Sequence, residues 1–145
     1  MNSILLLMGP NLNMLGEREP EIYGSETIQE HVNEAKRVAD EFGYELAHFQ
    51  SNNEGDLVDR IQKARSKHMG IIINPGALTH YGWSIHDALV AFNGVIIEMH
   101  LSNPNQREPW RHTSVVAPVA DGSIVGFGIH GYELSIRALH QIIEK

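Results

Sequence analysis

The sequence predicts an α/β protein in which helices cover both faces of one parallel, doubly wound sheet. Two observations support this prediction. Short apolar runs alternate with amphipathic helical patterns along the chain, an order that is typical of right-handed βαβ units. The 145 residues contain no linker, repeat or low-complexity stretch, which predicts a single domain over residues 1–145.

Each element follows from its own pattern. Residues 3–8 (SILLLM) form an apolar run that ends at Gly9-Pro10, so we expect a buried strand there. In residues 27–42 the apolar side chains recur at helical spacing, and Gly43 is a suitable stop. The same criteria predict strands at 45–49, 70–73 and 95–99, and helices at 54–67, 84–92 and 132–143.

A fifth strand is expected at residues 114–116, with residues 123–127 as a short hairpin partner or another edge of the sheet. Five strands in this length indicate a flavodoxin-like fold. Ligands bind such sheets outside the carboxyl ends of the strands, where the strand order reverses. We therefore expect the site in the loops that follow the strands, at 9–24, 50–53, 74–83 and 100–112.

Composition excludes several classes of function. The formal net charge is −7 and no basic stripe offsets it, so a nucleic-acid partner is not expected. The chain has no cysteine, which rules out disulfides, thiolate catalysis and cysteine-based metal sites. The apolar runs are too short for a signal peptide or a membrane span. We therefore expect a cytoplasmic protein that does not bind membranes.

Two motifs invite other interpretations. The glycines of residues 126–131 (GFGIHG) match G-x-G-x-x-G, but only fourteen residues follow, too few to complete a dinucleotide-binding unit. Nine histidines raise the possibility of a metal site. No H-E-x-x-H motif is present, so we expect no metal, although a cluster of His80, His86, His100 and His112 stays open as an alternative.

The loop of residues 9–24 is much longer than ordinary βα loops, and loops of this length are often functional. It carries Arg18 and Tyr23, which also fit a surface arginine and a tyrosine packed under the loop. In the strand that begins at residue 95, Glu98 and His100 share one face because residues two apart do so. A carboxylate there can hold the imidazole in its protonated form.

Several segments of the chain resemble a known family, the type II 3-dehydroquinate dehydratases. The resemblance covers nearly the whole chain in the family's order and spacing. It rests on GPNLNMLGEREPEIYG (9–24), QSNNEGDL (50–57), INPGALTH (73–80), EMHLSN (98–103), the RH-S pattern (111–114) and GFGIHGY (126–132).

The resemblance implies a cofactor-free and metal-free lyase that removes water from 3-dehydroquinate by anti elimination through an enolate, giving 3-dehydroshikimate. This step belongs to the shikimate pathway of aromatic amino acid biosynthesis or to quinate catabolism. The resemblance also implies a flavodoxin-like subunit assembled into trimers, four of which form a dodecamer.

Matching positions then suggest the role of each residue. Tyr23 would be the base, with Arg18 as its activating neighbour, and His100 would protonate the leaving hydroxyl while Glu98 orients it. Asn11 would hold a water that stabilises the enolate. Asp87 would reach the substrate of a neighbouring subunit. The substrate-binding residues would be Asn74, His80, Leu101, Ser102 and Arg111.

One segment departs from the family's commonest pattern, because residues 81–86 read YGWSIH where many members read like TSVALR. The length is unchanged, so Asp87 keeps its register, but the subunit contact is in doubt.

The residues of the first long loop are chemically suited to the proton abstraction that this reaction needs. Tyrosine is a poor base at neutral pH unless a cation stabilises its phenolate, and Arg18 is the nearest supplier in the sequence.

Two rival interpretations stay open from the sequence alone. One is a flavodoxin-like binding or regulatory module without catalysis, and the other is a metal-dependent lyase that uses the histidine cluster. A lysine imine mechanism is disfavoured, because none of the four lysines falls in an expected site loop.

Overall fold

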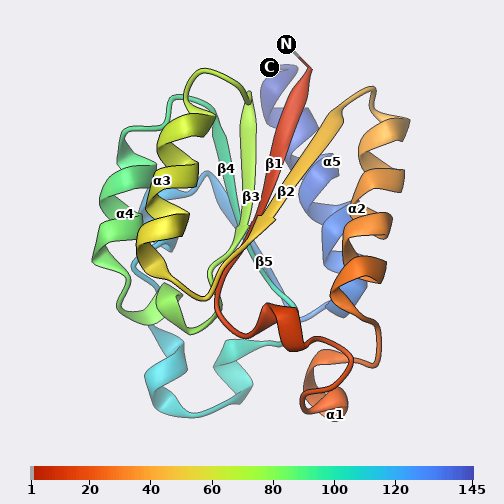
Figure 1. Ribbon diagram of the computed structural model, residues 1–145, viewed down its shortest axis with the longest axis vertical. Helices are drawn as coiled ribbons and strands as arrows, with labels where there is room; N and C mark the ends of the chain where they lie inside the picture. The colour runs from red at the N-terminus through yellow and green to blue at the C-terminus, as the bar shows by residue number, and fades with distance from the viewer. Residues whose placement is uncertain (1) are drawn as a thin grey trace.

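Five parallel strands form one sheet between two helical layers (Figure 1). The computed structural model describes residues 2–145. The strands are arranged in the order β2-β1-β3-β4-β5. Their bounds are Ser3–Met8 for β1, Glu45–Gln50 for β2, Gly70–Asn74 for β3, Val95–His100 for β4 and Gly122–Val125 for β5.

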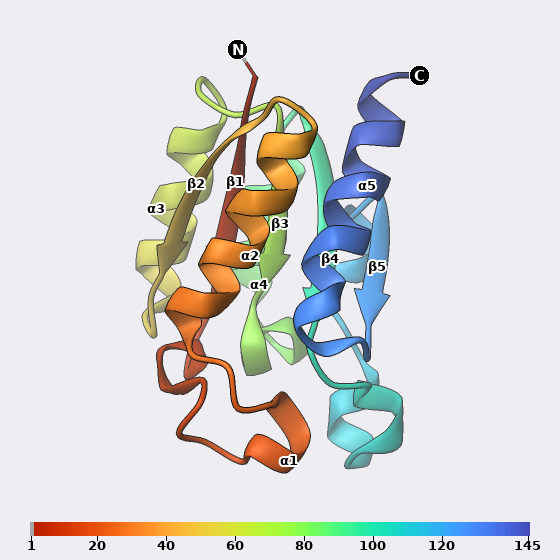
Figure 2. The same cartoon turned by 90° about the vertical axis from the view of Figure 1, so that its right-hand side faces the viewer.

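Helices cover both faces of the sheet, as the sequence predicts. The helices α2 (Ile28–Glu41) and α5 (Gly131–Ile143) lie on one face, and α3 (Glu54–Ala64) and α4 (Trp83–Val90) lie on the other (Figures 1 and 2). The short helix α1 (Pro20–Tyr23) lies below the carboxyl ends of the strands, away from both chain termini. Within residues 2–145, no helix combines the length and the apolar character needed to cross a membrane.

The core has two halves because side chains of a strand alternate between the faces of the sheet. Ile4, Leu6 and Met8 of β1 pack toward α2 and α5, whereas Leu5 and Leu7 pack toward α3 and α4. All five are fully buried. A strand that is buried on both faces has an unbroken apolar sequence and not an alternating one. This explains why the apolar run of residues 3–8 predicts a buried strand.

Local signals set the helix boundaries. Thr27 caps α2 through a capping box with Glu30, and Asn53 caps α3 by accepting hydrogen bonds from two backbone N–H groups. Gly43 follows α2 with a φ of 78°, a conformation that glycine adopts without strain. Apart from the fifth strand, the predicted strands and helices agree with the observed ones to within a few residues.

The prediction of a strand at residues 114–116 is wrong. This segment is irregular, although Val115 and Val116 are buried, and a short 3-10 helix (Ala117–Val119) follows it. Pro118 cannot donate a hydrogen bond to a strand ladder, so a strand cannot continue through it. The fifth strand is β5, which pairs with β4 in parallel at the edge of the sheet, so residues 123–127 supply an edge and not a hairpin partner.

The strand order reverses between β1 and β3, whose following loops leave in opposite directions and open a crevice at the carboxyl edge. The two loops also contact each other. The Gly9 N–H donates to the Asn74 carbonyl at 2.8 Å, and a side chain at Gly9 would lie 2.4 Å from the Pro75 carbonyl oxygen. This close approach brings residues 9–12 and 74–77 together at the entrance of the crevice.

Candidate active site

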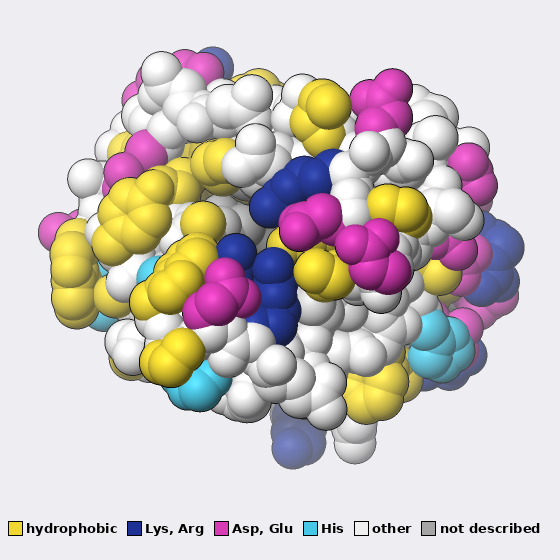
Figure 3. Space-filling model, turned by 90° about the horizontal axis from the view of Figure 1, so that it is seen from below, with side chains coloured by type: hydrophobic (Ala, Val, Ile, Leu, Met, Phe, Trp, Pro, Cys, Tyr) yellow, Lys and Arg dark blue, Asp and Glu magenta, His cyan; other side chains and the backbone are white. Residues whose placement is uncertain are grey.

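A cavity of about 210 Å³ lies at this switch point, below the carboxyl ends of β1, β3 and β4. Pockets for drug-sized ligands usually measure about 300–1,000 Å³, so this cavity suits a smaller molecule. It is lined by residues 10–12, Arg18, Tyr23, Asn74, Gly76, Ala77, His80, residues 100–102, Pro104, Arg107, Trp110 and Arg111. Arginine and lysine side chains gather near the centre of this face of the molecule (Figure 3).

The structure brings together most of the predicted site residues. Those that line the cavity are Asn11, Arg18, Tyr23, Asn74, His80, His100, Leu101, Ser102 and Arg111. Glu98 lies behind His100 and lines a second, smaller cavity on the far side of that imidazole. Asp87 lies elsewhere, in a shallow groove between α3 and α4 that Arg65 also lines. Asp87 is not among the residues that line the cavity of its own chain.

His100 and Glu98 form a directly hydrogen-bonded pair at the end of β4, as predicted from their spacing. The distance between His100 Nε2 and Glu98 Oε2 is 2.6 Å, and the Glu98 side chain is almost fully buried. Burial would raise the pKa of Glu98. The hydrogen bond and the charge of His100, together with hydrogen bonds from two hydroxyl groups, outweigh burial and lower the pKa. Glu98 is therefore a carboxylate that accepts a hydrogen bond from Nε2 of His100.

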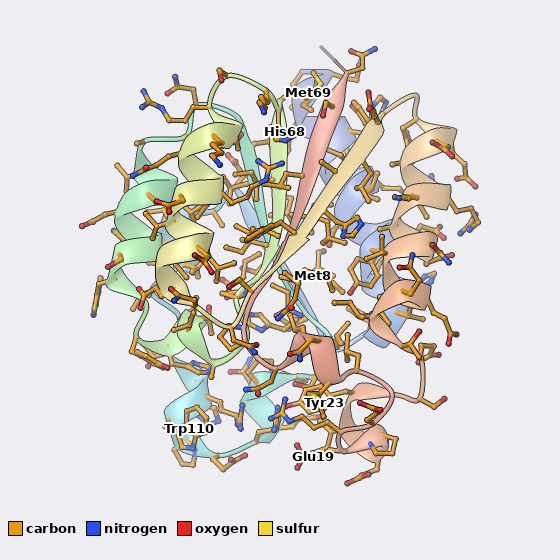
Figure 4. All side chains as sticks on the ribbon, in the orientation of Figure 1. Met8, Glu19, Tyr23, His68, Met69 and Trp110 are labelled. Atoms are coloured by element: carbon orange, nitrogen blue, oxygen red, sulfur yellow. The ribbon has the colours of Figure 1, made fainter. Side chains whose placement is uncertain are left out.

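Tyr23 reaches the cavity from α1, where the view with side chains places it at the carboxyl end of the sheet, near Trp110 (Figure 4). Its hydroxyl accepts a hydrogen bond from Nη1 of Arg107 at 2.8 Å. The guanidinium of Arg18 lies over the face of the Tyr23 ring, with 4.8 Å between its central carbon and the ring centroid. Two cations thus adjoin one phenol.

Arg107 and Trp110 are cavity residues that sequence reasoning did not assign. Arg107 also donates to the Ser102 hydroxyl at 3.2 Å, so it joins the loop after β4 to the tyrosine of the first long loop. Arg107 belongs to the predicted site loop of residues 100–112, but nothing in the local sequence indicates that it contacts a tyrosine 84 positions away. The positive charges at the cavity come from Arg18, Arg107 and Arg111.

Other polar groups face the same cavity. The side-chain oxygen of Asn74 accepts from the Gly76 N–H at 3.1 Å, which leaves its NH₂ group to donate to a ligand. Asn11 has a φ of 71°, an uncommon backbone conformation that recurs at functional sites. The Arg111 guanidinium stacks over the Trp110 ring at 4.0 Å.

His80 is suited to act as a neutral hydrogen-bonding group. Its Nδ1 lies 2.6 Å from the Thr113 carbonyl oxygen, so Nδ1 carries the proton and donates it. Burial lowers the pKa of His80, and the positive charges of His100 and Arg111 add to this effect against the opposing hydrogen bond with Thr113. Nε2 of His80 is then an acceptor for a substrate hydroxyl.

The structure shows the local arrangement of the histidines and of the glycine motif. Among residues 2–145, no three His, Cys, Asp or Glu side chains are grouped so that they could hold a metal ion. In the GFGIHG segment, Gly126 and Gly128 have φ values of 93° and 56°. These glycines permit the tight turn between β5 and α5.

Comparisons with known proteins agree with this geometry. The family model described as dehydroquinase class II matches residues 2–140. The 3-dehydroquinate dehydratase of Anoxybacillus flavithermus is 49% identical over 99% of this chain and 97% of its own length. The catabolic 3-dehydroquinase of Aspergillus clavatus is 54% identical over 92% of this chain and 89% of its own length.

Solved structures give the same result. The crystal structure of type II dehydroquinase from Propionibacterium acnes matches with a TM-score of 0.93 and 38% identity, covering 97% of both chains. That of the type II dehydroquinase from Butyrivibrio crossotus matches with a TM-score of 0.92 and 46% identity, covering 94% of this chain and 96% of the other. The cavity, the fold and these matches together show that the chain belongs to the class II dehydroquinase family.

Proposed function

We propose that the chain removes water from 3-dehydroquinate by anti elimination through an enolate, giving 3-dehydroshikimate. One observation carries the proposal. A tyrosine hydroxyl beside two guanidinium groups and an imidazole backed by a buried carboxylate line the same small cavity. These are the base and the acid that the elimination requires.

Tyr23 is the base in this proposal. Its phenolate takes a proton from the carbon next to the ketone, and the electrons of that C–H bond move into the enolate. A phenolate needs a neighbouring positive charge to be populated at neutral pH. Arg107 supplies that charge through a hydrogen bond to the hydroxyl, and Arg18 supplies it from the ring face.

His100 is the acid in this proposal. Its Nε2–H is held by Glu98, so Nδ1 is the nitrogen that gives a proton to the leaving hydroxyl. The enolate then collapses, the carbon–oxygen bond breaks, and the hydroxyl leaves as water. At the end of the reaction Tyr23 has gained one proton and His100 has lost one. Transfer of one proton from Tyr23 to His100 therefore restores the enzyme.

The remaining cavity residues bind the substrate. Asn11 holds the water that stabilises the enolate oxygen. The amide of Asn74, the imidazole of His80, the backbone at Leu101 and the hydroxyl of Ser102 hold the carboxylate and hydroxyl groups, together with Arg111. The three guanidinium groups at the cavity suit an anionic substrate, although the chain as a whole has a net charge of −7, because short-range interactions dominate over distant screened charges.

Both proton transfers are assigned to side chains of this chain, so the proposed reaction uses neither a metal nor an organic cofactor. It also forms no lysine imine. Treatment with borohydride in the presence of substrate should therefore leave the activity intact. Irreversible inactivation with a labelled lysine would show that the proposed chemistry is wrong.

The proposal extends to the assembly and the location of the protein. We propose trimers that join into a dodecamer, with Asp87 reaching the cavity of a neighbouring subunit. The position of Asp87 in a surface groove, outside the cavity of its own chain, supports this role. A sizing measurement tests it. A cytoplasmic location is part of the proposal, since a chain without cysteine needs no oxidising compartment.

One assay tests the function against its rivals. Purified protein is given 3-dehydroquinate, and the ultraviolet absorbance of the conjugated enone product is followed with and without a chelator. Turnover that survives the chelator is expected. Binding without turnover would indicate a binding module, and turnover lost to the chelator would indicate a metal-dependent lyase.

Two matched variants assign the base. Tyr23→Phe removes the hydroxyl and should abolish most turnover. Tyr81→Phe makes the same chemical change at a tyrosine whose side chain is 61% exposed and lies outside the cavity, and it should leave turnover unchanged. Equal activities of the two variants would remove Tyr23 from the mechanism.

A further inference from the structure

Glu98 is the most deeply buried acid near the cavity, with an exposed fraction of 2%, and it has three hydrogen-bond partners. His100 Nε2 lies 2.6 Å from its Oε2, and the Thr79 hydroxyl lies 2.5 Å from the same oxygen. The Ser114 hydroxyl lies 3.0 Å from both carboxyl oxygens. The roles proposed above use His100 and Glu98, but they leave Thr79 and Ser114 unexplained.

Backbone groups fix the direction of the Ser114 hydroxyl. Its oxygen accepts hydrogen bonds from the N–H groups of Val116 at 3.1 Å and Ala117 at 2.9 Å. A hydroxyl oxygen has two lone pairs, and both are now occupied. The Ser114 proton must therefore be donated, and the Glu98 carboxyl oxygens are the acceptors within reach.

The same argument fixes the Thr79 hydroxyl. It lies 2.9 Å from the Ser114 oxygen, but that oxygen has no lone pair left to accept its proton. The Thr79 proton is therefore donated to Glu98 as well. If Glu98 were protonated and donated to Thr79, the threonine proton would have no acceptor. Both hydroxyls consequently donate to the Glu98 carboxyl group, and these hydrogen bonds favour its ionised form.

Among the described residues that line the smaller cavity beside Glu98, there is no second acid. The charged or titratable side chains that face it are His100 on its own strand, His80 from the segment after β3, and Arg111 and His112 from the loop after β4. Each of these is cationic or neutral, so each favours the carboxylate or leaves it unchanged. On the β5 side, the partner of Glu98 in register is Ser123, which carries no charge.

We propose that Ser114 is a positioning residue whose hydroxyl, oriented by two backbone N–H groups, keeps Glu98 ionised and thereby holds the proton of His100 on Nε2. Ser114 does not line the main cavity, and its hydrogen bonds to Glu98 are what connect it with His100. The role in turnover rests on the proposed function, in which His100 is the acid. Thr79 is the second donor of the same device.

The test compares Ser114→Ala with Ser114→Thr and with Thr79→Val. Ser123→Ala is the matched control, because it deletes an exposed serine hydroxyl on the neighbouring strand in register with Glu98. The titration of Glu98 is followed by ¹³C NMR in protein labelled at the glutamate carboxyl carbons. Comparison with Glu98→Gln identifies its signal. This titration requires no substrate.

Loss of a hydrogen bond to a carboxylate raises the pKa of that group by about one to two units. The Glu98 midpoint should therefore rise by about one unit or more in Ser114→Ala, and it should return toward the wild-type value in Ser114→Thr. The acidic limb of the pH profile of kcat should move up by the same amount, while kcat at neutral pH changes little, because Glu98 stays ionised there after a rise of one unit from its lowered pKa. KM should change by less than about twofold. Ser123→Ala should behave as wild type in both measurements.

Several results would overturn the inference. A Glu98 midpoint that is the same in wild type and Ser114→Ala would remove the electrostatic role. A shift of the acidic limb of kcat that persists unchanged in a His100→Gln background would show that Ser114 does not act through the histidine. If circular dichroism shows that Ser114→Ala is unfolded, Thr79→Val gives the same two readings. Failure of the proposed function is a separate outcome, since wild type would then lack turnover while the Glu98 titration could still be measured.

Discussion

Replacement of Arg107 by alanine should reduce turnover because it removes the charge nearest to the Tyr23 oxygen. The guanidinium donates to that oxygen at 2.8 Å, and the Arg107 side chain is only 14% exposed. Solvent therefore screens this charge less than it screens the charge of Arg18, whose side chain is 36% exposed. A phenolate left without the hydrogen bond loses its most direct stabilisation.

The size of the effect follows from the geometry. A hydrogen bond to a charged group contributes about 1.5–3 kcal/mol. Two unit charges about 4 Å apart near a protein surface attract by about 4 kcal/mol, which sets an upper bound. A loss of about 2 kcal/mol in the transition state lowers kcat about thirtyfold. KM is measured alongside kcat, because Arg107 also lines the cavity and donates to Ser102.

The assay follows enone absorbance at saturating 3-dehydroquinate for four proteins: wild type, Arg107→Ala, Tyr23→Phe and the double variant. If Arg107 acts through the phenolate, its replacement should cost about thirtyfold in wild type and less than about threefold in the Tyr23→Phe background. Arg137→Ala, at an exposed arginine of α5 that pairs with Glu133, is the control and should retain full activity. An equal loss from Arg107→Ala in both backgrounds would refute the reasoning.

Three further predictions concern turnover and stability. Arg18→Ala should cut turnover severely while substrate binding, measured by calorimetry, stays largely intact; unchanged turnover would remove its assigned role. Burial lowers the pKa of His31 and His68, so below about pH 6.5 the folded state binds fewer protons than the unfolded state. Melting temperatures measured by circular dichroism should therefore fall as the pH drops below about 6.5, and a flat profile would contradict this. Gly76→Ala should lower the free energy of unfolding in urea by about 1–3 kcal/mol. The reason is that Gly76 has a φ of 61° and an added Cβ would lie 2.9 Å from the Pro10 carbonyl oxygen. Gly122→Ala is the control, because nothing lies within 4 Å of a Cβ added there.

Most of the fold could be predicted because its signals are local. The central strands are unbroken apolar runs, and the helices show regular apolar spacing with recognisable caps such as Thr27 and Asn53. The fifth strand could not be placed reliably, because a run of three residues does not distinguish a strand from a buried loop. The deciding contact is tertiary, since β5 pairs with β4 while Val115 and Val116 are buried without entering the sheet.

The site could be predicted where its partners are close in the sequence. Glu98 and His100 are two residues apart on a strand, so their shared face follows from the strand period. The partners of Tyr23 do not follow in this way. Arg18 is five residues away, and the sequence offered it as the cation, whereas Arg107 contacts the hydroxyl from 84 residues away. Ser114 reaches Glu98 over sixteen positions, and the RH-S pattern that contains it does not indicate this contact.

The acid and the base of this site are held in different ways. His100 ends a strand of the sheet, and its carboxylate partner is almost fully buried, so the acid is positioned by the core. Tyr23 belongs to the four-residue helix α1, which has no buried residue and begins after Glu19 in a left-handed conformation. Tyr23 is partly buried against the core on the α2 and α5 side of the sheet, and its contacts with Arg107 and Arg18 hold the phenol at the cavity. In the proposed mechanism the acid therefore depends on a strand of the sheet, whereas the base depends on a short helix and on two arginine side chains that contact its tyrosine.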